Sequence, residues 1–389
     1  MIKKSKILAN TLLTYSLTIQ PNETIFIYGE DIHDWFVKLL NERICELGGN
    51  SIVYLFNLNK RKKMIEENIL ANLKKEQKHI LKLMKKSNSM IEIISLSNPI
   101  YLNNVNPKKI TDYNNIIVNN IIKYRLGNGF DTEGMKWVLT EVPCIGQANL
   151  TKMTNEKYSN YLYKSTNQDW INENKRMQKI KELFDYGKNV RILVPGLTDF
   201  SFSLKNRGGY IEDGHINMPG GEIFYGPVED SANGYITFNT PIIRNAAVIK
   251  NIKLTFKEGK IIKYSAKTNQ KLLESLIKIK GANKLGEFAV GTNGKIKKFA
   301  KNISFDEKIN GTIHIALGNS YPYLLSNGGG LNKSKLHWDI VCDLRKKGKN
   351  PGGKIFVDDK LVQENGIWVF NITNEEKQFI PKNHKVFEN

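Results

Sequence analysis

The chain has 389 residues and a mass of 44.5 kDa, which exceeds the size at which one hydrophobic core usually stops growing, so two domains are expected. The formal net charge is +20, but only eight of the 58 basic residues are arginine, the usual reader of phosphates and bases, and a solvated lysine surface is therefore favoured over nucleic-acid binding. No run of about 18 apolar residues occurs, so no membrane span is expected.

The number and spacing of the cysteines and the N-terminal residues indicate the cellular compartment of the protein. Cys45, Cys144 and Cys342 are far apart and odd in number, and no CxxC spacing occurs, which argues against a disulfide framework and a thiolate zinc site. The opening MIKKSKILANTLLTYSL imitates a signal peptide, but polar residues break its apolar part and no small-x-small cleavage site follows. We therefore expect a cytoplasmic protein.

Helix and strand patterns alternate in the first half of the chain. Thr24 to Gly29, Ser51 to Asn57 and Ser89 to Ser95 have the composition of buried strands, and Ile32 to Gly49 is an amphipathic helix closed by two glycines. This βαβ order predicts parallel strands in a layered α/β domain.

Further segments complete this N-terminal domain. Ile7 to Tyr15 and a run near Ile116 to Leu126 have helical spacing, and Lys136 to Pro143 is predicted as the closing strand. A lysine-rich helical stretch from Lys60 to Ser87 is either a basic docking face or, as we favour, a solvated helix surface. Charged helical residues 151–187 bridge to the next part, which places the domain boundary at residue 187.

The character of the sequence changes after residue 187. Short strands alternate with Asp-Gly and Glu-Gly turns, and one helix, Asn269 to Ile279, interrupts them. We predict an antiparallel, β-rich α+β domain over residues 188–389, following the α/β domain of residues 1–187. Every candidate metal ligand lies in this second domain.

Two histidines stand in strand-like apolar runs of the second domain. His337 and Asp339 are two residues apart in KLHWDIVCDL, so strand alternation puts both side chains on one face, where both could reach one ion. His314 lies in TIHIALG, and taken alone it reads as a core histidine satisfied by one hydrogen bond.

Three glutamates have similar surroundings. Glu287 lies between Leu285-Gly286 and Phe288-Ala289-Val290, where a buried carboxylate needs a partner, a cation or a proton. Glu222 follows Pro219-Gly220-Gly221 at the mouth of a strand, and Glu307 lies in FDEKING. The alternative for Glu222 and Glu287 is a helix cap or a salt bridge to one of the many lysines, with Arg244 and Arg345 as the expected structural partners.

The joint pattern favours a metal site over independent salt bridges. Four acidic groups and two imidazoles on apolar or glycine-flanked segments suit two Zn²⁺ or Co²⁺ ions that share a carboxylate and lie about 3.5–4 Å apart. Tyr321, seven residues after His314, is either a hydrogen-bond donor to a tetrahedral oxyanion or a turn tyrosine before Pro322.

Four phrases carry a resemblance to a known family. NMPGGEIFYGP, LGEFAVGTN, FDEKINGTIHIALGNSYP and LHWDIVCDLR resemble the thermophilic metallo-aminopeptidases, that is, aminopeptidase T and its relatives. The match covers about residues 187 to 370, and YSLTIQPNETIFIYG is similar to the opening of that family. The resemblance implies a cytoplasmic, dimeric exopeptidase with two divalent cations, in which the N-terminal domain dimerises and restricts access to the site.

The resemblance also implies roles for individual residues. The metal ligands would be Glu222, Glu287, Glu307, His314, His337 and Asp339. Glu287 would bridge the ions, and it or Glu222 would move a proton to the leaving amine. Tyr321 would be catalytic, and Glu307 stands farther from His314 than in some members.

The expected function is thus hydrolysis of N-terminal amino acids from peptides through a metal-bridging hydroxide. Zinc or cobalt is the expected metal, with manganese or magnesium as alternatives. The rivals are a two-metal hydrolase of the same fold acting on a non-peptide amide, a basic nucleic-acid-binding protein, and a metal-binding protein without activity.

Overall fold

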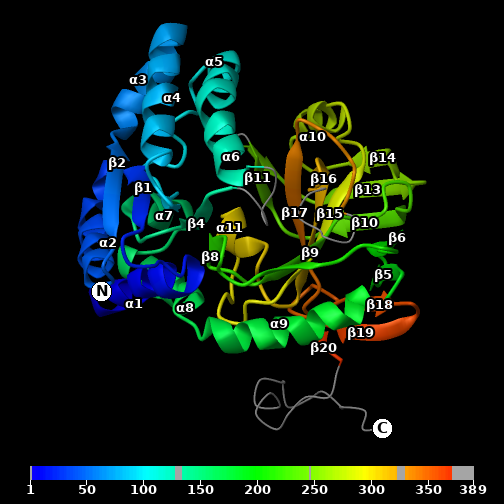
Figure 1. Ribbon diagram of the computed structural model, residues 1–389. Coiled ribbons are helices and arrows are strands. Elements are labelled where there is room, and N and C mark those ends of the chain that lie inside the picture. The colour runs from blue at the N-terminus through cyan, green and yellow to red at the C-terminus, as the bar shows by residue number, and fades with distance from the viewer. Residues whose placement is uncertain (1, 128–133, 245–246, 322–328, 370–389) are drawn as a thin grey trace.

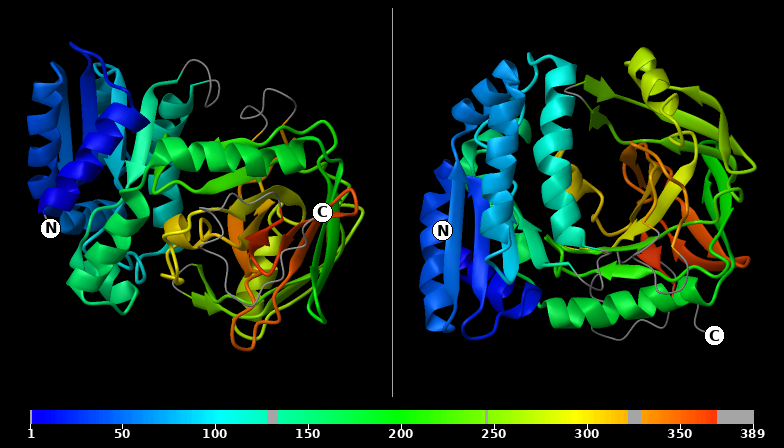
Figure 2. Two further views of the ribbon diagram at one scale, coloured as in Figure 1. Left: turned by 90° about the horizontal axis from the view of Figure 1, so that it is seen from below. Right: turned by 45° about the horizontal axis from the view of Figure 1, so that its top comes forward.

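A computed structural model describes residues 2–127, 134–244, 247–321 and 329–369, and it has a parallel-sheet part beside an antiparallel part (Figure 1). Helix α9 (Trp170–Asp185) runs along both parts (Figures 1 and 2), because Trp170 packs in the core of the first and Phe184 in the core of the second. The predicted fold class is confirmed. No helix among the described residues is long and apolar enough to cross a membrane.

The first part is a five-stranded parallel sheet with helices on both faces. Its strand order is β2 (Asn50–Phe56), β1 (Thr24–Glu30), β3 (Ser89–Ile93), β4 (Lys136–Thr140) and β8 (Asn217–Met218). Strand β1 is buried on both faces, since Ile25 and Ile27 face one core and Phe26 and Tyr28 the other.

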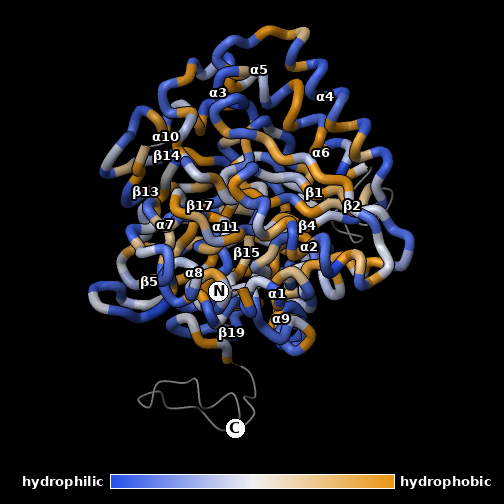
Figure 3. The backbone as a smooth tube through the Cα atoms, turned by 90° about the vertical axis from the view of Figure 1, so that its left-hand side faces the viewer, coloured by the Kyte–Doolittle hydropathy of each residue, from blue (hydrophilic) through white to orange (hydrophobic). Residues whose placement is uncertain are grey.

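Helices cover each face of this sheet. On the side of Ile25 lie α1 (Ile2–Thr11), the π-helical turn η1 (Leu12–Ser16), α2 (Asp34–Glu46) and α8 (Asn155–Thr166). On the side of Phe26 lie α3 (Leu58–Glu67), α4 (Leu70–Met84), α5 (Pro107–Tyr113), η3 (Asn114–Val118) and α6 (Asn119–Leu126). Hydrophobic and hydrophilic residues alternate along α4 (Figure 3), which fits the solvated lysine face expected from the sequence.

The helix predictions need local corrections. The lysine-rich stretch is two helices, because Asn68 adopts a left-handed conformation (φ 51°) that ends α3. The helical run near residue 116 begins earlier, at Pro107, whose fixed φ suits a first helical turn. Two short elements were not predicted, the 3₁₀ turn η2 (Asp31–His33) and α7 (Ile145–Leu150).

The strand predicted from Lys136 to Pro143 is present as β4, but the prediction that it closes the sheet is wrong. β4 is an inner strand, because β8, which belongs to the second half of the sequence, pairs in parallel beyond it through Leu139 and Thr140. Met218 of β8 lies in the same buried core as Ile25 and Phe36. The parallel sheet is therefore completed by a segment that lies immediately before Glu222.

The second part packs two antiparallel sheets face to face. The eight-stranded sheet has the order β14 (Lys260–Ser265), β13 (Ile252–Lys257), β10 (Asn233–Phe238), β6 (Thr198–Ser203), β5 (Asn189–Val194), β18 (Lys354–Val357), β19 (Lys360–Glu364) and β20 (Ile367–Trp368). The five-stranded sheet has the order β17 (His337–Asp343), β16 (Thr312–Gly318), β15 (Leu285–Gly291), β9 (Glu222–Tyr225) and β7 (Tyr210–Glu212).

Two smaller elements flank these sheets. The hairpin β11 (Ile242–Arg244) and β12 (Ala247–Ile249) stands beside them, and helix α10 (Gln270–Ile277) lies within the predicted helical range. One helix was expected in this part, but a second, α11 (Ile303–Asp306), is present.

The segment that carries α11 lies between the two parts of the molecule (Figure 1). Phe305 packs in the core of the parallel-sheet part, with its ring centroid 5.3 Å from that of Tyr161. The Asn302 side chain donates a hydrogen bond of 2.6 Å to Glu141, which follows β4. The N-terminal part therefore fixes the position of the residues that directly follow α11, and these are Glu307 and Lys308.

Candidate metal centre

The five-stranded sheet has two chemically different faces. Along β16, Ile313, Ile315 and Leu317 point into the core that this sheet shares with the eight-stranded sheet. His314 and Ala316 alternate with them and so point to the opposite face. All of β16 is buried, which means that the second face is covered as well, and the side chains on it must be satisfied inside the protein.

The strand register gathers the candidate ligands on that second face. Residues directly opposite each other in an antiparallel pair share a face. Each candidate on the sheet has a small residue opposite it on one neighbouring strand, and these pairs are Glu222 with Gly291, Glu287 with Ala316, Asp339 with Ala316, His337 with Gly318, and His314 with Ala289. On the other side, Glu222 stands opposite Glu212 and His314 opposite Val341. Small neighbours leave room above the sheet for the larger polar side chains and for an ion.

Gly291 also allows the segment after α11 to lie against the sheet. A Cβ atom at this position would stand 2.2 Å from the carbonyl oxygen of Ile309 and 2.9 Å from that of Glu307. No side chain fits at such distances, so only glycine permits this approach of the two backbones. Glu307 reaches the ligand face by this route.

The imidazoles and carboxylates are in direct contact. His314 Nε2 lies 3.2 Å from Glu287 Oε1 and 3.5 Å from Glu222 Oε2. His337 Nε2 lies 3.5 Å from the other oxygen, Glu287 Oε2, and 3.1 Å from Asp339 Oδ1. Glu287 therefore stands between the two histidines, with one oxygen directed to each.

Lys308 is a member of the site that the sequence analysis missed. Its ammonium is buried and lies 3.1 Å from Glu222 Oε1, and it also donates a short hydrogen bond to Glu307. The named arginine partners are wrong, since Arg345 bonds to Asp343, but the alternative of a salt bridge to a lysine is present at Glu222. A lysine next to an acidic residue is common in this lysine-rich chain, so no signal in the sequence distinguished Lys308.

The electrostatics of the protein without metal follow from these contacts. Burial lowers the pKa of both imidazoles, but the adjacent carboxylates outweigh it, and the pKa of His314 rises to about 9 and that of His337 to about 10. Burial raises the pKa of Glu287, and it raises that of Glu307 to about 8. Burial also opposes ionisation of Asp339, but the charge of His337 prevails and holds its pKa below the usual range. A metal ion would replace the imidazole protons as the positive charge of the site.

The donor groups fit divalent metal ions in two overlapping sets. One set is Glu222, Glu307 and His314, the other is Glu287, His314 and Asp339, and the ligand atoms of each set lie within 4.8 Å of one another. Glu222 Oε2 and Asp339 Oδ1 are buried and form no well-directed hydrogen bond, although an imidazole nitrogen lies 3.5 and 3.1 Å from them, so both oxygens fit a role as metal ligands. Carboxylate and imidazole donors together suit Zn²⁺, Co²⁺ or Mn²⁺.

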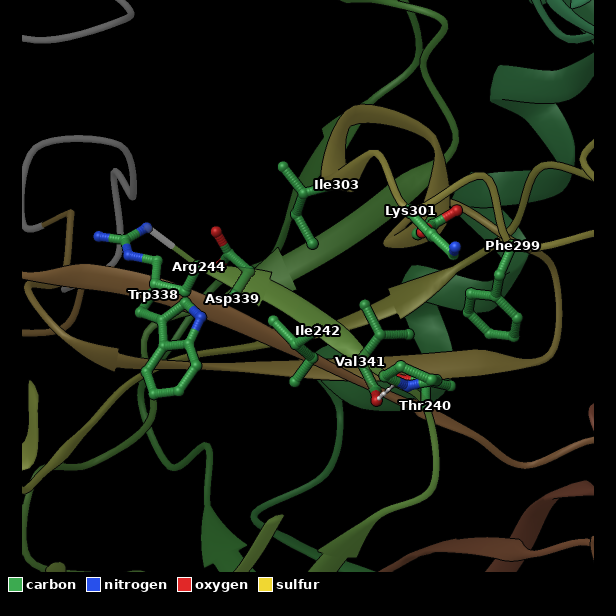
Figure 4. A pocket seen from close by; sticks show the side chains of 11 residues that line it. Thr240, Ile242, Arg244, Phe299, Lys301, Ile303, Trp338, Asp339 and Val341 are labelled. Atoms are coloured by element: carbon green, nitrogen blue, oxygen red, sulfur yellow. Dashed lines mark hydrogen bonds between the residues drawn. The ribbon is translucent and has the colours of Figure 1, made fainter. Parts of the chain in front are cut away.

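A cavity of about 100 Å³ opens beside Asp339. Figure 4 shows Asp339 and Arg244 toward one end of it and Phe299 and Lys301 toward the other. Ile242 and Val341 add apolar walls, and the backbone carbonyl of Val341 accepts a hydrogen bond of 2.6 Å from Thr240. The space inside this cavity, which is lined by described residues, borders the candidate ligand Asp339.

Tyr321 stands at another side of the site. Its ring centroid is 4.8 Å from that of His337 and 6.2 Å from that of Phe224. The side chain is partly buried. It therefore lies beside an imidazole of the cluster, whereas Pro322, on which the alternative interpretation rested, is outside the described residues.

A buried face with two sets of carboxylate and imidazole donors fits a metal-binding protein. A family model of the thermophilic metalloproteases (M29) matches residues 2–368, and the chain belongs to this family. The resemblance inferred from the sequence is confirmed, and so is the expectation of a metal-dependent peptidase.

Curated relatives extend this similarity. The chain is 25% identical over 319 residues to Aminopeptidase 2 of Geobacillus stearothermophilus, which covers 72% of this chain and 76% of the relative. It is 26% identical over 328 residues to Aminopeptidase AmpS of Bacillus subtilis (strain 168), covering 74% of this chain and 78% of the relative. A shorter match, 33% identical over 140 residues, links 32% of the chain to 33% of Aminopeptidase PepS of Streptococcus thermophilus.

Solved structures share the fold. Wild-type AmpT from Thermus thermophilus superposes with a TM-score of 0.78 at 18% identity, over 95% of this chain and all of that chain. A 2,5-dihydroxypyridine dioxygenase from Pseudomonas putida KT2440 superposes with a TM-score of 0.60 at 14% identity, over 96% and 98%. Because these two proteins carry names of different reactions, the fold alone does not determine the chemistry.

Proposed function

We propose that this protein is a metal-dependent aminopeptidase, which releases N-terminal amino acids from peptides with two divalent ions held by Glu222, Glu287, Glu307, His314, His337 and Asp339. The observation that carries this proposal is the pair of donor sets that meet at His314 on one buried sheet face. Membership of a metalloprotease family and the names of the curated relatives support the peptide substrate and the choice of the N-terminal end.

The metal ligands and acceptor groups of the site support a substrate with a free amine. The site carboxylates are matched by one contacting ammonium, that of Lys308, within the described part of the chain. A free α-amine can bind a metal ion or donate hydrogen bonds to these carboxylates, whereas an acylated N-terminus offers no such amine. The cavity beside Asp339 has apolar walls from Ile242, Val341 and Phe299, which suit the side chain of the first residue.

The proposed chemistry divides between metal and protein. Bound divalent ions would polarise the scissile carbonyl and lower the pKa of an attacking water. A carboxylate, Glu287 or Glu222, would accept a proton from the water and return it to the leaving amine, and the burial of Glu287 between both histidines supports this role for Glu287. Tyr321, beside His337, would donate a hydrogen bond to the carbonyl oxygen as negative charge develops there.

Zinc or cobalt is the proposed metal, because two imidazoles favour these ions over magnesium, with manganese as the alternative. We further propose a cytoplasmic homodimer that binds no nucleic acid. Its N-terminal domain, residues 1–187, would dimerise and limit access to the catalytic domain, residues 188–389. The packing of α11 against the N-terminal part supports a role of that part in shaping the site.

The proposal is tested by substrate choice after metal reconstitution. The purified protein is stripped with chelator, Zn²⁺, Co²⁺, Mn²⁺ or Mg²⁺ is added back, and hydrolysis of leucyl-arylamide is compared with that of N-acetyl-leucyl-arylamide. An aminopeptidase cleaves only the free-amine substrate, and only with metal. Cleavage of the acetylated substrate alone would favour the non-peptide amide hydrolase, and no cleavage with any metal would refute both.

A further inference from the structure

Lys308 is held rigidly inside the metal centre. Its side chain is 1% exposed, and its ammonium contacts Glu222 and Glu307, two of the three members of one donor set. Its backbone is fixed as well, because its N–H donates to the Phe305 carbonyl and its carbonyl accepts from Asn293. The ammonium is therefore a built part of this set and not a surface lysine that happens to fold inward.

The ammonium makes the two donor sets unequal in charge. The set of Glu222, Glu307 and His314 carries two carboxylates and one ammonium, a net charge of −1 with neutral imidazole. The set of Glu287, His314 and Asp339 carries two carboxylates and no contacting lysine or arginine among the described residues, a net charge of −2. A divalent ion is neutralised in the second set and leaves an excess positive charge in the first.

The summed charge of both donor sets also shows that the second ion leaves an excess positive charge. The four ligand carboxylates and the Lys308 ammonium, counted without the neighbouring Glu212, sum to −3, so the first divalent ion brings this group to −1 and the second to +1. Without the ammonium the two ions would bring it from −4 to −2 and then to zero. Buried excess charge is strongly unfavourable, and the ammonium also occupies an oxygen of Glu222 and one of Glu307.

We propose that Lys308 sets the order and strength of metal binding: one divalent ion binds tightly at Glu287, His314 and Asp339, and the second binds weakly at Glu222 and Glu307 because the ammonium competes with it. This rests on the proposed function only in taking the cluster as a metal site. A weak second site makes the number of bound ions depend on the free metal concentration.

The test is a metal titration of the stripped protein by calorimetry, with the bound metal counted by elemental analysis. For the wild-type chain we expect two steps whose dissociation constants differ by about 100-fold or more. Lys308→Met keeps the length of the side chain but removes the charge, and it should strengthen the second step by about 100-fold so that both steps merge. The matched control is Lys278→Met, which removes an exposed lysine paired with Glu274 and should leave both steps unchanged.

Equal binding of two ions by the wild-type chain, or an unchanged second step in Lys308→Met, would overturn the proposal. If Lys308→Met does not fold, Glu307→Gln decides: it should abolish the weak step and preserve the tight one, and loss of the tight step would contradict the assignment. Arylamide hydrolysis is measured on the same samples. If two unequal metal-binding steps are observed without arylamide hydrolysis, the proposed aminopeptidase activity is refuted, but the proposed order of metal binding is supported.

Discussion

Two buried ion clusters, one in each part of the molecule, differ in their charge balance. Between β3 and α6, Arg125 donates to Glu92 at 2.6 Å and lies 3.9 Å above the ring of Trp137, so one cation faces one carboxylate. At the ligand face of the five-stranded sheet, four carboxylates lie close together, and among the described residues Lys308 is the one lysine or arginine that contacts any of them, at Glu222 and Glu307. A balanced pair needs no further partner and is structural, whereas the unbalanced cluster needs further positive charge, either from imidazole protons or from metal ions.

The largest expected effect is on activity, which should depend on the carboxylate and imidazole cluster and not on the Arg125–Glu92 pair. Glu287→Gln keeps the shape of the side chain but removes a charged ligand and the proposed proton carrier, so kcat/KM should fall by about 10³-fold and bound metal should decrease. Glu92→Gln, in the balanced pair, should leave kcat/KM and metal content near those of the wild-type chain. A fall of less than tenfold in Glu287→Gln would show that the two clusters do not differ in this way.

Loss of the Arg125–Glu92 pair should lower the stability of the protein and leave its activity unchanged. Arg125→Met leaves Glu92 without its partner in a largely buried position, and the free energy of unfolding should fall by about 3 kcal/mol, as measured by urea denaturation. The activity of the remaining folded protein should not change. Arg125→Met combined with Glu92→Gln should recover part of the loss, and additive losses would contradict a direct pairing.

Tyr321 tests whether the chemistry extends beyond the charged cluster. Tyr321→Phe removes only the hydroxyl, so kcat should fall by about 100-fold through loss of one oxyanion donor, while KM and metal content stay the same. Tyr186→Phe, at an exposed position, is the control. A change in metal content without a change in kcat would instead give Tyr321 a role in holding the ligands.

The smallest effect is a pH dependence of stability that only the protein without metal should show. The pKa of His314 rises on folding from 6.5 to about 9 and that of His337 to about 10, so protonation stabilises the folded state below pH 6.5 and this contribution is lost as the pH rises through 9 to 10. Glu307, with its pKa raised to about 8, contributes in the same direction above pH 4.5.

Differential scanning calorimetry with and without metal checks this dependence. The Tm of the chelator-treated protein should fall by a few degrees more than that of the metal-loaded protein between pH 6.5 and 10, because metal ligands are already deprotonated. Parallel curves for the two forms would contradict the assignment of these histidines as ligands.

Local patterns allowed part of this site to be predicted. The two-residue spacing of His337 and Asp339 predicted both side chains on one sheet face, and the strand register agrees with that. The α/β and β-rich halves were predictable because period-two and helical patterns are strong in both.

Long-range packing was not predictable. The pairing of β8 with β4 joins segments about 80 residues apart, and the burial of Lys308 depends on contacts of α11 with the N-terminal part. The arginine partners assigned to Glu222 and Glu287 were wrong for the same reason, since a sequence does not show which of many cations a fold will bury.

The central claim is that the unbalanced carboxylates of the five-stranded sheet bind divalent ions. Crystals of the protein grown with Zn²⁺ or Co²⁺ and measured at the absorption edge of the metal test it most directly. The account predicts an anomalous peak about 2.0–2.2 Å from donor atoms of Glu287, His314 and Asp339, with a weaker peak toward Glu222 and Glu307. The absence of any peak within this cluster, with metal bound elsewhere on the chain, would contradict it.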